Sequence, residues 1–215
     1  MIRAVIFDFD GTLANTLPLC YESFRRAVKE LVGREPSNEE IEKCFGPDDL
    51  GVIRLLLPEN PELHTKGKEL FLKYYETWHT DLADKLYPHV EEVLRKLQQK
   101  GVRIAMVTGK AWESTEISLR HYGLEKYFTI VETGSPDGGI KPQKIKEVLR
   151  KLELSGAEAL YVGDALSDID ACKQVPIRIA SVGWGEGVNL EALKARNTDY
   201  ILQYVEDLPI LVESL

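Results

Sequence analysis

The apolar segment Val5–Phe7 runs directly into two carboxylates, Asp8 and Asp10, with a glycine and a threonine behind them. An apolar run rich in Val, Ile and Phe is typical of a strand buried on both faces of a sheet. Unpaired charges are costly in such a place, so the two acids indicate a site rather than a structural end to the strand. Open α/β sheets bind ligands outside the carboxyl ends of their strands, which is where these acids would lie.

Further strand-like segments recur along the chain, with helix-period apolar patterns such as Val90–Leu97 and Ile145–Leu152 between them. This alternation predicts an α/β fold with a Rossmann-like parallel sheet core flanked by helices. The predicted strands are Arg3–Phe7, Val102–Val107, Phe128–Glu132, Ala159–Val162, Ile177–Val182 and Tyr200–Leu202.

The interval between Phe7 and Val102 is far longer than an ordinary crossover between strands. It carries helical patterns throughout, which predicts an inserted all-α cap domain directly after the first strand. We expect residues 15–84 to form the cap, and residues 1–14 and 85–215 to form the core that holds the sheet. A site at the mouth between core and insert follows, because ligand clefts often lie between domains.

Three patterns within this interval support the helices. Phe24–Leu31 holds one apolar stripe, and Leu70, Tyr74 and Trp78 mark another at helical spacing. Ser37–Glu40 has the form of a capping box, which starts a further helix.

The charge and cysteine content restrict the classes of partner. A net charge of -8 argues against a nucleic-acid partner, which requires a basic face, but allows a small anionic substrate beside local cations or a metal ion. Cys20, Cys44 and Cys172 are widely spaced without a CxxC motif, as expected of reduced thiols in a cytoplasmic protein. No apolar run approaches the ~18 residues of a membrane span, so we expect no membrane partner.

Three further segments would converge on the paired acids if each sits at the carboxyl end of a parallel strand. Thr108 and Gly109 follow one strand, and the glycine lets the backbone approach a ligand closely. Lys141 lies in a Gly/Pro-rich loop ahead of a helix. Asp164 follows another apolar strand, with Asp168 shortly after it.

This inventory suits phosphoryl transfer, in which catalysis is mostly positioning and charge stabilisation. A carboxylate can attack phosphorus to form an aspartyl-phosphate, and Lys141 and a metal ion can offset the charge. Mg²⁺ prefers oxygen ligands, so we expect Asp8 and Asp164 to bind it, with Asp168 orienting a bound water or Lys141. Asp10 would protonate the leaving oxygen and later deprotonate the hydrolytic water.

The string Asp8–Leu13 resembles the first motif of the haloacid dehalogenase-like superfamily of phosphohydrolases. Thr108, Lys141 and the pair Asp164 and Asp168 are similar to its second, third and fourth motifs, in the same order. The resemblance covers essentially the whole chain, including a helical cap inserted after the first motif. It is greatest to the phosphoglycolate phosphatase-like members.

The resemblance implies a role for each motif residue. Asp8 would be the nucleophile and Asp10 the acid and base. Thr108 and Lys141 would hold the phosphoryl group, and Mg²⁺ would bind Asp8, Asp164 and the main-chain carbonyl of Asp10. Relatives that cleave carbon–halogen bonds lack an acid at the position of Asp10, so its presence favours phosphate substrates.

Two motifs depart from the usual pattern. Gly109 stands where Asn is common, so that a side-chain contact is either missing or made by Lys110, which we otherwise expect at the surface or at the rim of the substrate site. Gln143 and Lys144 follow Pro142 in the third motif, which affects the stiffness of the loop more than its chemistry.

The expected partner is a small phosphorylated metabolite, either a phosphoglycolate-like ester or an anhydride, and the expected assembly is a monomer or a homodimer. A sugar-phosphate mutase of the same superfamily is one alternative. A phospho-accepting receiver-like signalling domain is another, although such domains need neither a cap nor an acid placed like Asp10.

Substrate contacts from the insert are hard to select by pattern. The candidates are Arg25, Lys43, Arg54 and His64. The turn Gly183–Gly185, with Trp184 at its centre, could either line the cleft or pack in the core.

Overall fold

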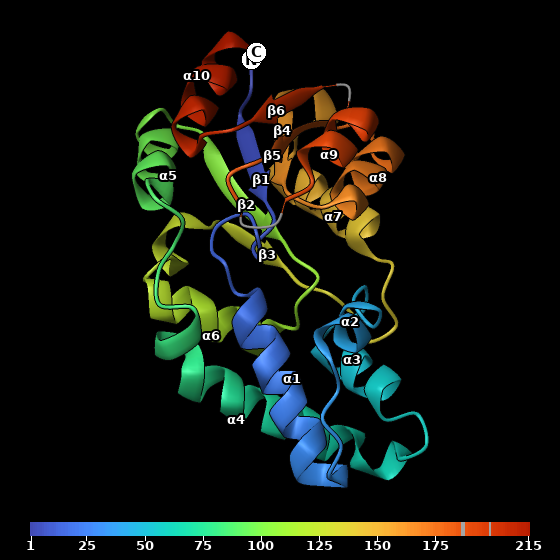
Figure 1. The fold of residues 1–215 in the computed structure, drawn as a ribbon. Coiled ribbons are helices and arrows are strands. Elements are labelled where there is room, and N and C mark those ends of the chain that lie inside the picture. Colours follow the sequence, from blue (N-terminus) through green and yellow to red (C-terminus); the bar gives the residue numbers. More distant parts are fainter. Residues whose placement is uncertain (186–187, 198) are drawn as a thin grey trace.

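The computed structural model describes residues 1–185, 188–197 and 199–215. At its centre lies a six-stranded sheet in the order β3-β2-β1-β4-β5-β6, with every neighbouring pair parallel (Figure 1). The predicted parallel α/β fold is therefore confirmed, and the strand ends differ from the predicted ones by one or two residues. The strands are β1 (Ala4–Phe7), β2 (Arg103–Val107), β3 (Ile130–Glu132), β4 (Ala159–Gly163), β5 (Arg178–Val182) and β6 (Tyr200–Leu202).

The central strand β1 is apolar throughout because both of its faces are covered. Val5 and Phe7 join one hydrophobic cluster, whereas Ala4 and Ile6 join the cluster on the opposite face. Alternate residues of a strand point to opposite faces, so the segment needs apolar side chains at every position.

Helices cover both faces of the sheet. One face packs against α5 (Val90–Gln99) and α10 (Leu208–Ser214), and the other packs against α7 (Lys141–Leu152), α8 (Leu166–Gln174) and α9 (Leu190–Arg196) (Figure 1). The two predicted apolar stripes, Val90–Leu97 and Ile145–Leu152, are the buried faces of α5 and α7. A further helix, α6 (Trp112–Tyr122), follows β2.

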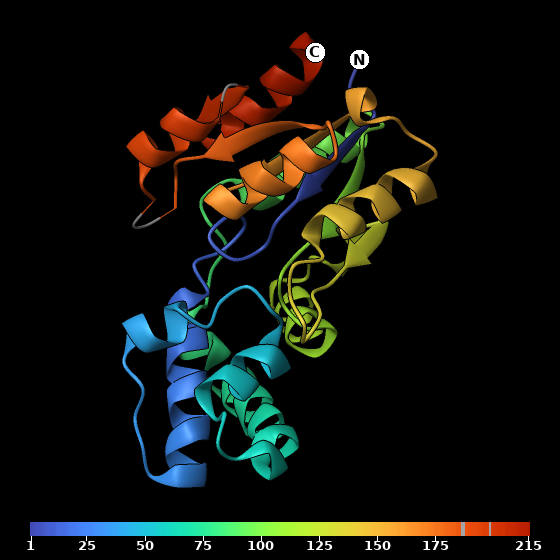
Figure 2. The ribbon, with the colours of Figure 1, turned by 90° about the vertical axis from the view of Figure 1, so that its right-hand side faces the viewer.

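The interval after β1 forms a helical unit with a hydrophobic cluster of its own, below the sheet in Figure 2. Its helices are α1 (Leu17–Val32), α2 (Asn38–Glu42), α3 (Asp49–Leu56) and α4 (His64–Leu82). Phe24 of α1 stacks on Phe71 of α4 with ring centroids 4.1 Å apart. The predicted capping box is present, because Ser37 and Glu40 bond reciprocally at the start of α2.

The apolar stripe predicted along α4 is only partly correct. Leu70 is buried, but Tyr74 and Trp78 are half-buried and stack on each other with centroids 4.7 Å apart. The buried face instead includes Phe71 and Tyr75, because α4 packs against α1 on one side and α6 on another. Because α4 has two neighbouring helices, its buried residues differ from those that spacing within α4 predicts.

The two connections between the sheet and the helical unit run side by side. Ala14 on the outgoing connection forms an antiparallel bridge with Leu86 on the returning one, and the amide of Tyr87 donates to the carbonyl of Leu13 at 2.9 Å. The division into residues 1–14 and 85–215 as core and 15–84 as cap stays a prediction. None of the helices in the described ranges is long and apolar enough to cross a membrane.

Candidate active site

The carboxyl ends of the central strands meet at a cleft between the sheet and the helical unit. Asp8 follows β1, Thr108 follows β2 and Asp164 follows β4. In a sheet of this order, successive connections turn in opposite directions beside the β1–β4 pair, and ligands bind at such a switch point. A pocket of about 450 Å³ lies there, and its lining includes Asp8, Asp10, Thr108 and Lys141.

Lys141 opens α7 and brings its ammonium group between two acids. Its Nζ lies 2.9 Å from Oδ2 of Asp8 and 2.5 Å from Oδ1 of Asp168. Asp168 is fully buried, and its Oδ2 accepts a hydrogen bond from the amide of Ala165 at 3.1 Å. The hydroxyl of Tyr161 donates to Oδ1 of Asp168 at 3.3 Å. A bound water and Lys141 were the two partners expected for Asp168, and the structure shows the contact with Lys141.

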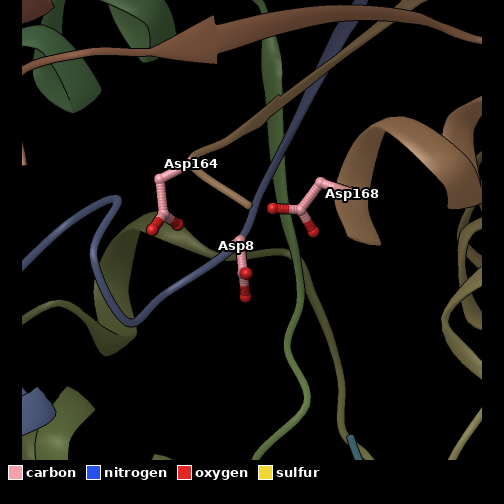
Figure 3. Close-up of side chains that lie close together, drawn as sticks. All are labelled: Asp8, Asp164 and Asp168. Atoms are coloured by element: carbon pink, nitrogen blue, oxygen red, sulfur yellow. The ribbon is translucent and has the colours of Figure 1, made fainter. Parts of the chain in front are cut away.

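Asp8 directly follows β1, Asp164 directly follows β4, and Asp168 lies in α8, and the three acids gather at one place (Figure 3). The amide of Phe9 donates to Oδ1 of Asp8 at 2.8 Å. The hydroxyl of Thr12 donates to Oδ1 of Asp164 at 2.9 Å. The glycine of the first motif is required sterically, because a Cβ at position 11 would overlap the Asp164 carboxylate.

Burial dominates the electrostatics of this group. It raises the pKa of Asp8 to about 6, against the lowering effect of Lys141. Burial, together with the charges of Asp8 and Asp168, raises the pKa of Asp164 to about 7. Burial alone would lower the pKa of Lys141, but the charges of Asp168 and Asp8 raise it overall. The acids therefore crowd into a space that favours additional positive charge.

The same carboxylates fit a divalent cation. One oxygen from each of Asp8, Asp164 and Asp168 lies within 4.8 Å of the others. The ammonium of Lys141 already contacts one oxygen of Asp8 and one of Asp168. That Asp8 and Asp164 are the acids that bind the metal stays a prediction. An all-oxygen set with one or two carboxylates is what Mg²⁺ uses in proteins.

Thr108 and Gly109 lie where the loops after β2 and β3 meet. Thr108 is buried, and its hydroxyl accepts a hydrogen bond from the amide of Lys110 at 3.3 Å. Gly109 lines the pocket, and a Cβ there would meet no atom within 4 Å. A Cβ would therefore meet open space at Gly109, so the glycine leaves that part of the pocket open.

Asp10 and Lys110 form a second charged pair in the pocket. The Nζ of Lys110 lies 3.4 Å from Oδ1 of Asp10, which also accepts a hydrogen bond from Thr16. Of the two places expected for Lys110, the surface is wrong, because the residue is only 5% exposed, whereas the lysine does line the pocket. It is buried because its alkyl chain turns inward beneath the helical unit, where its ammonium meets the hydroxyl of Tyr75 at 2.8 Å. Nothing in the local sequence indicates that contact, because Tyr75 is distant along the chain.

The four cations considered as substrate contacts are engaged elsewhere and do not line this pocket in the described part of the chain. Lys43 pairs with Glu39, and Arg54 pairs with Asp137. Arg25 bonds to Glu22, Pro36 and Asn38, and His64 bonds to the carbonyl of Leu57.

The helical unit instead presents a mostly apolar surface to the pocket. The side chains that form it are Leu17, Cys20, Phe24, Phe45, Pro47, Asp49 and Val52. Asp49 is the acid of this set, and burial raises its pKa to about 6. Its carboxylate accepts a hydrogen bond from Ser114 of α6. The neighbouring Asp48 caps the start of α3 by accepting from the amides of Leu50 and Gly51, and no local pattern indicates that Asp49 faces the site.

Trp184 packs against the hydrophobic cluster on the α5 side of the sheet rather than lining the pocket. Its indole Nε1 donates to the carbonyl of Thr12 at 2.9 Å. Lining the cleft and packing in the core were the two roles considered for this turn, and Trp184 packs in the core. Its hydrogen bond to Thr12 also holds the loop of the first motif.

The chain resembles proteins of known family along almost its whole length. It is 30% identical over 218 residues to a phosphoglycolate phosphatase of Vibrio parahaemolyticus, which covers 96% of this chain and 94% of that protein. It is 30% identical over 216 residues to the pyrophosphatase PpaX of Bacillus pumilus, covering 98% of this chain and 96% of that protein.

A solved structure shares the fold. A predicted phosphoglycolate phosphatase from Haemophilus somnus 129pt superposes with a TM-score of 0.83 at 22% identity, covering 98% of this chain and 97% of that one. Residues 5–182 match the family described as haloacid dehalogenase-like hydrolase. The arrangement of strands, the converging acids and this match together place the chain in the haloacid dehalogenase-like hydrolase family.

Proposed function

We propose that this chain is a Mg²⁺-dependent phosphatase that hydrolyses a small phosphate ester or anhydride through an aspartyl-phosphate on Asp8. The observation that carries the proposal is the ammonium of Lys141, fixed 2.9 Å from Oδ2 of Asp8. A nucleophilic carboxylate needs such a cation when it attacks a phosphate dianion. Family membership supports hydrolysis, and the names of the relatives support phosphate substrates.

In the first half of the reaction, an oxygen of Asp8 forms a bond to phosphorus as the bond to the leaving oxygen breaks. Lys141 offsets the charge of the transferring group, while Thr108 and the backbone at Gly109 hold its oxygens. Asp10 gives its proton to the leaving oxygen. In the second half, water attacks the phosphorus and passes a proton to Asp10. The bond between phosphorus and Asp8 breaks, which releases phosphate and restores the Asp8 carboxylate.

The carboxylates of Asp8 and Asp164, with the main-chain carbonyl of Asp10, would hold Mg²⁺. When bound, the ion supplies positive charge that lowers the repulsion between an anionic nucleophile and an anionic substrate. Asp168 acts through Lys141, which it holds in place.

The helical unit would act as the cap over this site, with residues 15–84 as the cap and the rest as the core. Its position over the pocket would exclude bulk water and place specificity side chains near the leaving group. A phosphoglycolate-like ester and a pyrophosphate-like anhydride are the candidate substrates, after the names of the relatives. A cytoplasmic location and a monomeric or homodimeric state stay predictions.

The test is metal-dependent release of inorganic phosphate from a generic aryl phosphate, followed by a screen of phosphorylated metabolites. Asp8→Asn should lower the rate by at least about a thousandfold, because an amide cannot form the aspartyl-phosphate. Asp137→Asn removes a carboxylate that is 89% exposed and should leave the rate unchanged. Full activity in Asp8→Asn, or activity that survives removal of divalent cations, would contradict the proposal.

The same assay separates the alternatives. A mutase converts one sugar phosphate into its isomer without net phosphate release, and a receiver-like domain retains its phosphoryl group without turnover. The family match and the curated relatives described above are hydrolases, so they favour neither alternative.

A further inference from the structure

Lys110 is a buried cation whose position the proposed mechanism does not explain. Its side chain follows β2, it is 5% exposed, and its Nζ lies 4.3 Å from the centroid of the Tyr75 ring. Removing an ammonium group from water is costly unless partners replace its hydration. The partners that the structure shows are the hydroxyl of Tyr75 at 2.8 Å and Oδ1 of Asp10 at 3.4 Å.

Tyr75 is itself fixed from behind. It is fully buried in α4, and its hydroxyl lies 2.9 Å from the Oγ of Ser118 in α6. The same Oγ lies 2.9 Å from Nε2 of His79, one turn further along α4. A continuous chain of polar contacts therefore runs from Asp10 through Lys110 and Tyr75 to the packed interface of α4 and α6.

The two oxygens of Asp10 are not equivalent in this arrangement. Both Thr16 and Lys110 donate to Oδ1. Because these two donors hold Oδ1, Oδ2 is the oxygen left to interact with the leaving group. The carboxyl group lies in the pocket, where Oδ2 can face the leaving group.

We propose that Lys110 is a positioning residue, anchored by Tyr75 of the helical unit, which orients Asp10 so that its Oδ2 exchanges the proton with the leaving group. The inference rests on the proposed phosphatase function. In the step concerned, the Oδ2–H bond breaks and an O–H bond forms on the leaving oxygen as its bond to phosphorus breaks. Lys110 takes no part in the bond changes.

A consequence concerns the helical unit. Tyr75 belongs to α4, whereas Lys110 and Asp10 lie on loops of the sheet. The contact at 2.8 Å between Lys110 and Tyr75 exists only with α4 in the position that the structure shows. The contact between Lys110 and Tyr75 therefore links the position of Asp10 to the packing of α4.

The test compares two substrates that differ in their need for a proton. Dinitrophenolate leaves without protonation, whereas phenolate benefits from an acid, and general acids contribute about 10²–10⁴-fold. The probes are 2,4-dinitrophenyl phosphate and phenyl phosphate, and the quantity is kcat/KM, which reports the first phosphoryl transfer. Lys110→Met should lower kcat/KM for phenyl phosphate at least about tenfold more than for the dinitrophenyl ester.

Two further variants complete the design. Tyr75→Phe keeps the ring but removes the anchoring hydroxyl, and should change the ratio of the two rates in the same direction by a smaller factor. It also decides the matter if Lys110→Met fails to fold. Lys68→Met is the matched control, because Lys68 of α4 pairs with Glu113 of α6 at 2.7 Å across the same boundary without approaching Asp10. Its ratio should equal that of the wild type.

The outcomes separate the two proposals. If the wild-type protein hydrolyses neither ester with added Mg²⁺, the proposed function fails. If the wild type is active but Lys110→Met and Tyr75→Phe lower both rates equally or leave both unchanged, Lys110 has only a structural role and this inference is overturned.

Discussion

The ammonium of Lys141 lies 2.5 Å from the carboxylate of Asp168, which has no exposed surface. The same ammonium reaches Asp8 at 2.9 Å, so the contact with Asp168 determines where the cation meets the proposed nucleophile. Such a pair is sensitive to the loss of one partner, because Lys141, whose side chain is 19% exposed, would keep Asp8 but lose the shorter of its two ion pairs.

Asp168→Asn should therefore be costly in two ways. Removing one charge of a buried pair typically destabilises a protein by about 3–5 kcal/mol, and the asparagine amide would recover part of this by hydrogen bonding. We expect a loss of about 2–3 kcal/mol in the free energy of unfolding, measured with urea, and a fall in kcat/KM of at least about tenfold. Asp170→Asn, on the same helix, breaks a pair with Arg196 that is 47% exposed on both sides and should cost at most about 1 kcal/mol. Equal losses in the two variants would contradict this account.

Thr12→Val should weaken metal binding more than it weakens the fold. The Thr12 hydroxyl donates to Oδ1 of Asp164 at 2.9 Å, and valine keeps the shape of the side chain without the donor. Residues that orient a metal ligand commonly contribute about 10–100-fold to affinity. We expect the half-saturating Mg²⁺ concentration to rise at least about tenfold, with most of kcat retained at saturating Mg²⁺. Thr77→Val, at an exposed site in α4, should leave the Mg²⁺ titration unchanged; a shift there of similar size would show that the effect is not specific to Asp164.

Gly11 and Gly33 allow a matched comparison of two glycines with similar backbones. Their φ angles are +75° and +72°, but a Cβ at Gly11 would overlap the Asp164 carboxylate, whereas one at Gly33 meets nothing within 4 Å. Gly33→Ala should cost only about 1 kcal/mol of backbone strain and leave activity intact. Gly11→Ala should destabilise the protein further and displace Asp164, which would raise the Mg²⁺ requirement. Thermal unfolding and Mg²⁺ titration of both variants check this, and equal behaviour of the two would refute it.

His79 should make the fold sensitive to mild acid. Burial, with His121 and Lys110 nearby, lowers the pKa of His79 to about 4 from an ordinary value of 6.5. Between these two values the unfolded chain binds more protons than the folded one, so the contribution is complete above about pH 6.5 and is lost as the pH falls toward 4. From pH 7 to pH 5 the loss should be roughly 1–2 kcal/mol.

Urea unfolding at the two pH values tests this prediction. His79→Gln should be less stable at pH 7 but should lose less stability on acidification than the wild type. His89→Asn serves as control, because His89 is half exposed at 52% of its side chain and has a left-handed backbone that asparagine tolerates. The wild type and His89→Asn should lose the same amount of unfolding free energy between pH 7 and pH 5. If His79→Gln loses just as much, the role given to His79 is contradicted.

The order of strands and helices could be predicted because it depends on local periodicity. The apolar runs at β1 and β4 require burial on both faces, and parallel pairing then brings Asp8 and Asp164 to the same edge of the sheet. The capping box at Ser37 is likewise a local signal that the structure reproduces. The roles of Asp8 and Asp164 in catalysis and metal binding stay predictions.

Other features depend on which distant residues pack together. The buried face of α4 follows Phe71 and Tyr75 because α1 and α6 both pack on it, which no stripe within α4 reveals. The surface that the helical unit presents to the pocket is mostly apolar, and it does not include the cations chosen from the sequence.

The sequence by itself determined the parallel sheet, the inserted helices and the meeting of Asp8 and Asp164, because strand periodicity and strand ends are encoded within short segments. Only the tertiary structure decided the surroundings of Asp10. Lys110 follows Thr108 by two residues in the loop after β2, and Tyr75 lies in the helical unit, yet the ammonium of Lys110 and the hydroxyl of Tyr75 meet at 2.8 Å in the interior. A buried ammonium depends on the partners that replace its hydration, and those partners are set by the packing of helices far apart in the chain.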